Sequence, residues 1–212
     1  MKQKIIQYVH KPNTREYFNA LANYPMFIKL LNPEGKTYRR LYDWLKENKD
    51  MLTDEQTKLP SIKELSAKLE IEASKIAKQF RMIYNDIVDL NWNQPNLFCE
   101  PNRKLCLLSF NYLESYAQFY LGLEIIPRVG ESFSFPFVYP QNGGHSFYVK
   151  SVSHFYERDG QGINIDLNSE FPSQYLQLLK EKALLHNEIT FTEFLTNSRI
   201  LDEYLVKLHN SL

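Results

Sequence analysis

Two helical patterns joined by a short turn stand in Leu59-Pro-Ser-Ile-Lys-Glu-Leu-Ser-Ala-Lys-Leu-Glu-Ile-Glu-Ala-Ser-Lys-Ile-Ala-Lys-Gln-Phe80. Ser61 precedes the first apolar-periodic run and Glu64 follows three residues later, which is the reciprocal arrangement of a capping box at a helix start. We therefore predict one helix from Ile62 to Leu69 and a second from about Ala73 to Leu90. The buried face of the second helix is expected to carry Ile76, Phe80, Ile83, Tyr84 and Ile87.

The same stretch resembles the helix-turn-helix of bacterial transcription regulators, and is similar to the winged form with a Leu-Pro-Ser opening in GntR-type repressors. The resemblance covers about residues 59–84, and the matching positions are Leu65, Ser66, Leu69, Ile71, Ile76 and Phe80. A small residue at the crossing and apolar residues at the contacts allow two short helices to cross steeply. Glu70 stands where the family usually has Gly, so we expect a turn built without a left-handed residue.

This resemblance implies double-stranded DNA as a partner, with the second helix in the major groove and phosphate contacts around it. The exposed side of that helix would present Ser74, Lys75, Lys78, Gln79 and Arg81. Lys and Arg could neutralise phosphates, and Gln79 or Arg81 could reach base edges. Between residues 73 and 85 there are three basic residues and no acid, in a chain whose 25 basic and 25 acidic residues cancel. Three cations on a helix also suit an ordinary solvated face.

A wing is a further possibility in this reading. Residues 97–108 could form a hairpin with its tip at Pro101-Asn-Arg-Lys104, which would place Arg103 and Lys104 where winged proteins touch the DNA backbone. The competing interpretation makes Lys104 to Phe110 the first strand of a β-region.

The rest of the first half also reads as helical. Apolar residues recur at three- and four-residue spacing from Thr14 to Leu31, and Pro25 is expected to divide this run into two short helices. A further helix is predicted from Thr37 to Lys49, followed by a loop or one loose turn over residues 51–59.

After Asn91-Trp-Asn-Gln-Pro95 the composition changes to short runs rich in Tyr, Phe, Val and Ile. The candidate strands are Lys104 to Phe110, Tyr116 to Leu123, Ser132 to Val138, Ser146 to Phe155 and Gly162 to Leu167, and turn clusters lie at residues 140–144 and 158–162. From Pro172 the helical pattern returns and runs to Leu208. We predict an α+β protein with a helical domain over 1–95. A β-rich domain over 96–212 would hold an antiparallel meander or small SH3-like barrel followed by helices.

Composition restricts the class of protein. Hydrophobic residues make up 43% of the chain and aromatic residues 14%, so the chain should fold. No apolar run is long enough for a membrane span, and the start Met1 to Gln7 lacks a signal-peptide pattern. Two cysteines, Cys99 and Cys106, form neither a disulfide framework nor a zinc motif, and Cys106 is expected to be buried. We expect a cytoplasmic protein with no cofactor and no membrane partner.

The sequence does not favour an enzyme. The five histidines show no metal-binding spacing, and no phosphate-binding or nucleophile motif is present. One cluster could be assembled by neighbouring strands, from His145, His154 and Asp166 with Glu131 nearby, but catalysis would require these groups to share one face. We therefore predict no catalytic residues and no metal site.

The β-rich half carries more aromatic residues than one buried face would use, so some are expected to be covered by the terminal helices or used for oligomerisation or a protein partner. Two functions follow from these patterns. The first is a DNA-binding regulator or mobile-element accessory protein with a helix-turn-helix recognition helix. The alternative is a non-catalytic interaction or oligomerisation protein that uses the same fold as a scaffold.

Overall fold

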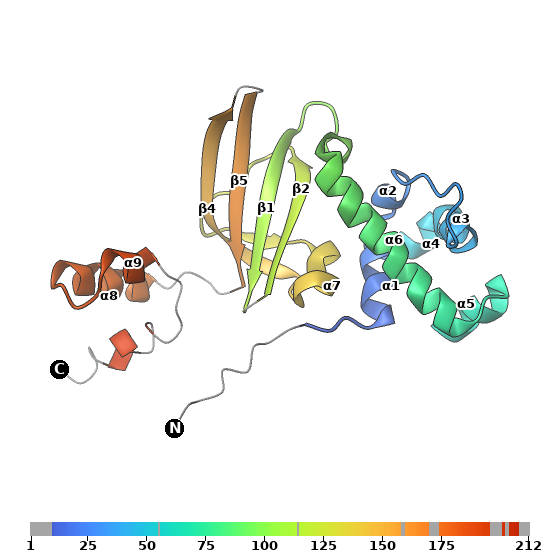
Figure 1. The fold of residues 1–212 in the computed structure, drawn as a ribbon, viewed down its shortest axis with the longest axis horizontal. Helices are drawn as coiled ribbons and strands as arrows, with labels where there is room; N and C mark the ends of the chain where they lie inside the picture. Colours follow the sequence, from blue (N-terminus) through green and yellow to red (C-terminus); the bar gives the residue numbers. More distant parts are fainter. Residues whose placement is uncertain are drawn as a thin grey trace. The chain divides into compact units, whose positions relative to one another are not determined.

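The computed structural model describes residues 10–54, 56–113, 115–157, 160–169, 174–195, 201 and 204–207. Helices occupy the N-terminal half, a curled five-stranded sheet follows, and short helices come last (Figure 1). The predicted α+β class is confirmed. In the part of the chain that is described, no helix has the length and apolar character needed to cross a membrane. The start Met1 to Gln7 lies outside the described residues.

The helices of the first half are α1 (Thr14–Asn23), α2 (Pro25–Ile28), α3 (Arg39–Glu47), α4 (Lys49–Thr53), α5 (Ile62–Leu69) and α6 (Ala73–Asn93). Pro25 divides the first helical run as expected, because it occupies the first turn of α2, where its missing N–H costs nothing. The predicted bounds of α5 are confirmed, and Ser61 and Glu64 form the predicted capping box. Helix α6 extends three residues beyond the predicted end.

The strands are β1 (Lys104–Tyr112), β2 (Ser115–Leu123), β3 (Ser132–Ser134), β4 (Ser146–Glu157) and β5 (Gly160–Asn168), in the spatial order β2-β1-β5-β4-β3. The last three strands pair sequentially and antiparallel, which confirms the predicted meander over residues 132–167. The whole sheet is mixed, because β1 pairs with β5 in parallel. Of the turn cluster at 158–162, residues 160–162 already belong to β5, and Arg158 and Asp159 lie outside the described residues.

The segment expected to be one strand from Ser132 to Val138 leaves the sheet early. The strand ends at Ser134, residues Pro136–Val138 form a 3-10 helix (η2), and Tyr139–Asn142 form α7. Pro136 cannot donate to a strand ladder, so the pairing with β4 stops before it. This departure turns Phe135 and Phe137 into the core, where they are 2% and 0% exposed.

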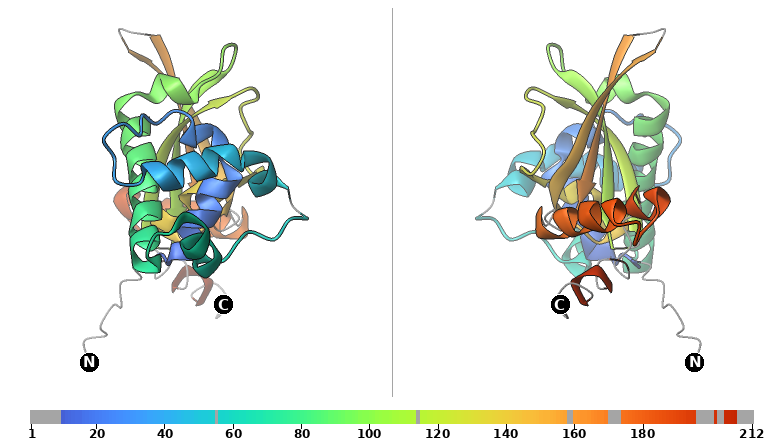
Figure 2. Two further views of the ribbon diagram at one scale, coloured as in Figure 1. Left: turned by 90° about the vertical axis from the view of Figure 1, so that its right-hand side faces the viewer. Right: turned by 90° about the vertical axis from the view of Figure 1, so that its left-hand side faces the viewer.

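One hydrophobic core extends from α1 to β5, and the helices of the N-terminal half and the sheet form two layers around it (Figure 2). The chain divides into compact units at Met1–Ser169 and Glu170–Leu212. These units do not coincide with the expected domains over 1–95 and 96–212, because the helices and the sheet bury their apolar faces against each other. The second unit contains α8 (Gln174–Leu185) and α9 (Phe191–Leu195) around Ala183, Ile189 and Leu205. Leu208, at the end of the predicted helical pattern, is not described.

Two polar side chains of α6 hold the helix to the β-rich part of the first unit, Asn91 by bonds to strand β2 and Tyr84 by a bond to η2. Asn91 is 1% exposed, and its amide both donates to the Tyr120 carbonyl and accepts from the Tyr120 N–H, each at 2.8 Å. The Tyr84 hydroxyl donates to the Phe137 carbonyl oxygen at 2.8 Å. Because β2 is an edge strand, Asn91 takes the place that a neighbouring strand would fill beside Tyr120.

We expect Asn91→Ala to lower the free energy of unfolding by about 2–4 kcal/mol, because it leaves two backbone groups of Tyr120 without partners. The matched control is Asn93→Ala on the same helix, where the exposed amide bonds only to the Asp89 carbonyl; it should change stability by no more than about 0.5 kcal/mol. Urea denaturation of both variants measures the difference. Equal midpoints would show that the Asn91 amide does not hold the helix to the sheet.

Candidate nucleic-acid interface

The turn between α5 and α6 contains a left-handed residue, contrary to the sequence expectation. Glu70 lies at φ +53°, and its N–H donates to the Ser66 carbonyl. The Ile71 N–H donates to the same carbonyl at 3.2 Å, and the Ser66 hydroxyl donates to the Ile71 carbonyl at 2.7 Å. These bonds close the end of α5 and offset the cost of a left-handed non-glycine residue.

Apolar residues of α5 and α6 pack against each other and against α1. Leu65, Leu69, Ile76 and Phe80 are all buried, and Phe80 stacks on Phe18 of α1 with ring centroids 4.8 Å apart. With its apolar side against α1 and α5, α6 leaves the opposite side of its first turns exposed.

Arg15 connects α1 to the start of α5. Its guanidinium donates to the Pro60 carbonyl at 2.9 Å and lies 5.3 Å from the centre of the Phe18 ring. This bond ties α1 to the segment that leads into α5.

At the first turn of α6, two of the predicted DNA-binding residues, Ser74 and Lys75, contact the carboxylate of Glu72. Ser74 and Lys75 are exposed, but the Ser74 hydroxyl donates to a Glu72 carboxylate oxygen at 2.5 Å. The Lys75 ammonium lies 3.8 Å from the other oxygen of the same carboxylate. Glu72 was not considered at the sequence level, although its three-residue spacing from Lys75 is the signal for such a pair.

Gln79 has a structural partner. Its side-chain amide donates to the Thr37 carbonyl at 3.0 Å, which holds the segment before α3 against α6. The predicted contact of Gln79 with a base edge would require this bond to open. Arg81 lies on the other side of the helix and remains exposed.

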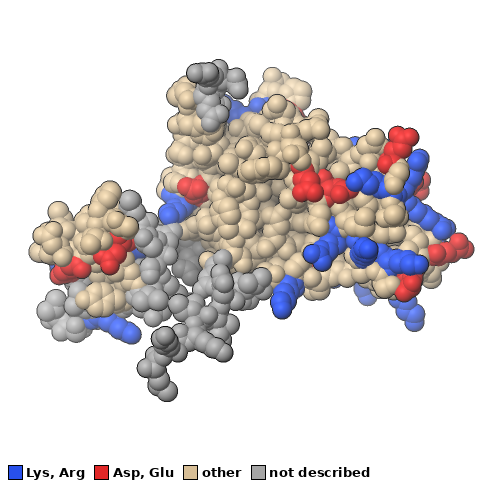
Figure 3. All heavy atoms as spheres, in the orientation of Figure 1, with Lys and Arg blue, Asp and Glu red and all other residues tan. Residues whose placement is uncertain are grey.

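Lys78 and Arg81 meet a third cation across a hollow of about 480 Å³. The hollow is lined by His10, Lys11, Pro12, Thr14 and Tyr17 on one side and by Ala77, Lys78 and Arg81 on the other. None of the described residues that line it is acidic. Basic side chains gather on the face over α1, α5 and the first turns of α6, with acidic groups at its margins (Figure 3). Lys11 was missed by sequence reasoning because no local pattern relates it to a helix so distant in the chain.

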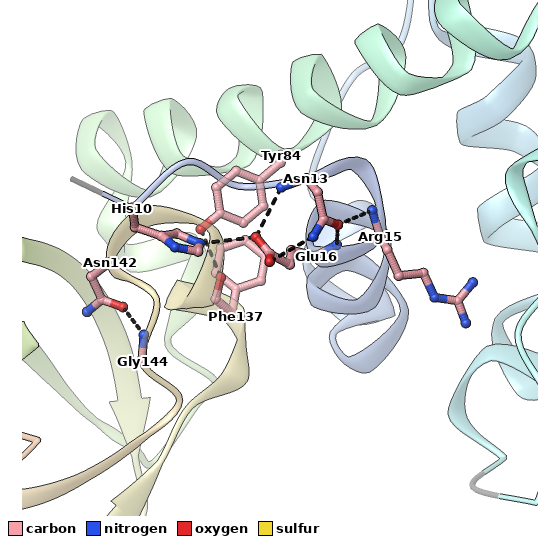
Figure 4. A network of polar contacts seen from close by, with 8 residues as sticks. All are labelled: His10, Asn13, Arg15, Glu16, Tyr84, Phe137, Asn142 and Gly144. Atoms are coloured by element: carbon pink, nitrogen blue, oxygen red, sulfur yellow. Dashed lines mark hydrogen bonds and ion pairs between the residues drawn. The ribbon is translucent and has the colours of Figure 1, made fainter. Parts of the chain in front are cut away.

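The segment that carries Lys11 is held by a polar network (Figure 4). His10 Nε2 lies 3.0 Å from a Glu16 carboxylate oxygen, and the same carboxylate accepts from the backbone N–H and the side-chain amide of Asn13. The His10 ring also packs edge-on against Tyr139 of α7. In this network the Glu16 carboxylate is directed toward His10 and Asn13.

Tyr17 lines the hollow, and the charges near it affect the pKa of its phenol. Burial raises the pKa of its phenol, while the nearby guanidinium of Arg81 lowers it and Glu16 raises it. The net direction is upward, so at neutral pH the hydroxyl keeps its proton and can donate a hydrogen bond.

The expected wing is not formed, and the alternative reading of this segment is confirmed. Residues Pro95–Phe98 form a 3-10 helix (η1), and β1 begins at Lys104 and pairs with β2 and β5. Arg103 is paired with Glu100 at 2.7 Å, and Lys104 is exposed. Both residues follow the C-terminal end of α6, so nearly the whole of a helix about 30 Å long separates them from Lys75 and Lys78.

The possible catalytic cluster is split by the register of the sheet. His154 pairs with Ile163, which faces the core, whereas Asp166 pairs with Ser151 on the opposite face. The Asp166 carboxylate accepts from the Ser151 hydroxyl at 2.7 Å, and Glu131 accepts from the Arg128 N–H. Among the described residues, no three His, Cys, Asp or Glu side chains lie close enough together to hold a metal ion.

Comparisons with known proteins identify no relative. No family model matches the chain, no curated protein matches its sequence, and no solved structure matches its fold. The resemblance to GntR-type regulators therefore stays a prediction.

We expect Glu70→Gly to stabilise the protein by about 0.5–1 kcal/mol, because glycine adopts a left-handed backbone without the steric cost that Glu70 bears. Glu70→Gln separates this effect from the loss of the exposed ion pair with Arg40, which joins the two side chains at 3.3 Å and should contribute little. Thermal melts of the two variants provide the measurement. Destabilisation by Gly with no effect of Gln would contradict the left-handed turn.

Proposed function

We propose that the protein binds double-stranded DNA through the exposed side of α6 and the segment before α1. The observation that carries this proposal is the convergence of Lys11, Lys78 and Arg81 on one hollow with no acidic lining residue among those described. The charge of the whole chain is zero, so this local excess is what would attract a polyanion.

The packing of α5 against α6, which resembles that of a helix-turn-helix, supports the same function. In such folds the second helix enters the major groove and neighbouring cations contact phosphates. Here Glu72 offsets Lys75 at the first turn, so the positive region begins one turn later, at Lys78 and Arg81. Arg81 is the residue we assign to base edges, and Lys78 and Lys11 are assigned to phosphates.

Regulation of transcription, or an accessory role in a mobile element, is the biological setting we propose for this binding. Oligomerisation or a protein partner through the β-rich half, and a cytoplasmic location, stay predictions.

We expect Lys78→Ala/Arg81→Ala to weaken binding to a duplex and to lower the salt slope by about one unit for each phosphate that the variant no longer neutralises. The matched control is Arg103→Ala/Lys104→Ala, which also removes one Arg and one Lys but at the opposite end of α6. Mobility-shift titrations at two salt concentrations give the affinities, and thermal melts show that both variants fold. A wild-type protein without salt-dependent affinity, or equally weakened binding in the two double variants, would rule out this interface.

A further inference from the structure

The hollow beside α6 offers more positive charge than one internal DNA phosphate carries. Three cations, Lys11, Lys78 and Arg81, line it, and an internal phosphodiester has a single negative charge. A phosphomonoester carries between about 1.5 and 2 negative charges at pH 7, because its second pKa is about 6. The charge of the hollow therefore fits a terminal phosphate better than an internal one.

The room in the hollow exceeds what a phosphate group alone needs. Its volume of about 480 Å³ lies within the range of about 300–1,000 Å³ typical of small-molecule sites. Ala77 contributes only a methyl group to the part of the lining that α6 supplies, next to the long side chains of Lys78 and Arg81. A nucleoside attached to the phosphate can be accommodated as well.

The walls supply suitable hydrogen-bond donors. The Arg81 guanidinium can bind two phosphate oxygens at once, and the two ammonium groups act as compact charges. Thr14 and Tyr17 add hydroxyl groups at the same hollow, and Tyr17 is 9% exposed. The His10 network holds the backbone that carries Lys11, so a ligand has to order only the side chain of Lys11 and not the segment itself.

We propose that this hollow binds a phosphomonoester, either the terminal phosphate of a nucleic-acid strand or that of a free mononucleotide. Binding of a strand end deepens the DNA-binding function proposed above and rests on it. Binding of a free mononucleotide does not depend on that function.

The first experiment compares duplexes of one sequence that carry phosphates at both 5′ ends, phosphates at both 3′ ends, or only terminal hydroxyls. We expect a phosphorylated duplex to bind about tenfold more tightly than the hydroxyl duplex, which corresponds to roughly one charge-assisted hydrogen bond. Lys11→Gln should reduce this ratio to less than about threefold. The matched control is Lys46→Gln, on α3 and outside the hollow, which should keep the ratio.

The second experiment titrates the full chain with adenosine 5′-monophosphate and with adenosine in a calorimeter. Binding of the nucleotide but not the nucleoside, abolished in Lys11→Gln and kept in Lys46→Gln, supports the hollow with a free nucleotide as its ligand. A preference for phosphorylated ends without nucleotide binding assigns the strand end instead.

The outcomes separate the two proposals. Equal affinity for all three duplexes, together with no preference for the nucleotide over adenosine, would overturn the phosphomonoester site even if salt-dependent duplex binding persists. Nucleotide binding in a protein without duplex affinity would overturn the DNA-binding function and leave the hollow as a nucleotide site. A preference that Lys11→Gln leaves unchanged would also overturn the assignment.

Discussion

The paired hydrogen bonds between the Asn91 amide and the backbone of Tyr120 couple the two layers of the first unit. A buried amide without these partners would destabilise the interface, and the exposed edge of β2 would keep unpaired groups. With both bonds made, the C-terminal end of α6 is anchored to the sheet. Tyr84 adds a second anchor two turns earlier, and burial keeps its pKa well above the usual range, so its hydroxyl remains a donor.

Aromatic packing also joins the helices to the β-rich part of the first unit. Phe137 leaves the strand region with η2 and packs edge-on against Phe27 of α2, with ring centroids 5.1 Å apart, and it stacks on Tyr84 of α6 at 4.9 Å. Such ring pairs contribute beyond the area that they bury. The aromatic surplus of the β-rich half is thus used largely within the chain, while Tyr116 and Tyr156 remain exposed at 54% and 81%.

Helix α6 is held near its C-terminal end by β2 and at Phe80 and Tyr84 by rings of α1, so its first turns belong to an anchored helix. Phosphate recognition benefits from this arrangement, since a backbone that is already fixed loses little entropy on binding. The same anchoring gives the hollow a fixed wall, and the His10 and Glu16 contacts fix the facing segment. The proposed interface is therefore built from the packing of the whole unit rather than from α5 and α6 alone.

The sequence by itself determined the elements whose signals are local. The capping box at Ser61, the buried stripe of α6 and the meander of the last three strands depend on spacings of two to four residues or on turn chemistry, and all are present. Tertiary structure alone decided the rest. It brought Lys11 and Lys78 to the same hollow, bonded Gln79 to Thr37 and set His154 and Asp166 on opposite faces of the sheet. These outcomes depend on contacts between residues distant in the chain and on strand register, which no local periodicity encodes.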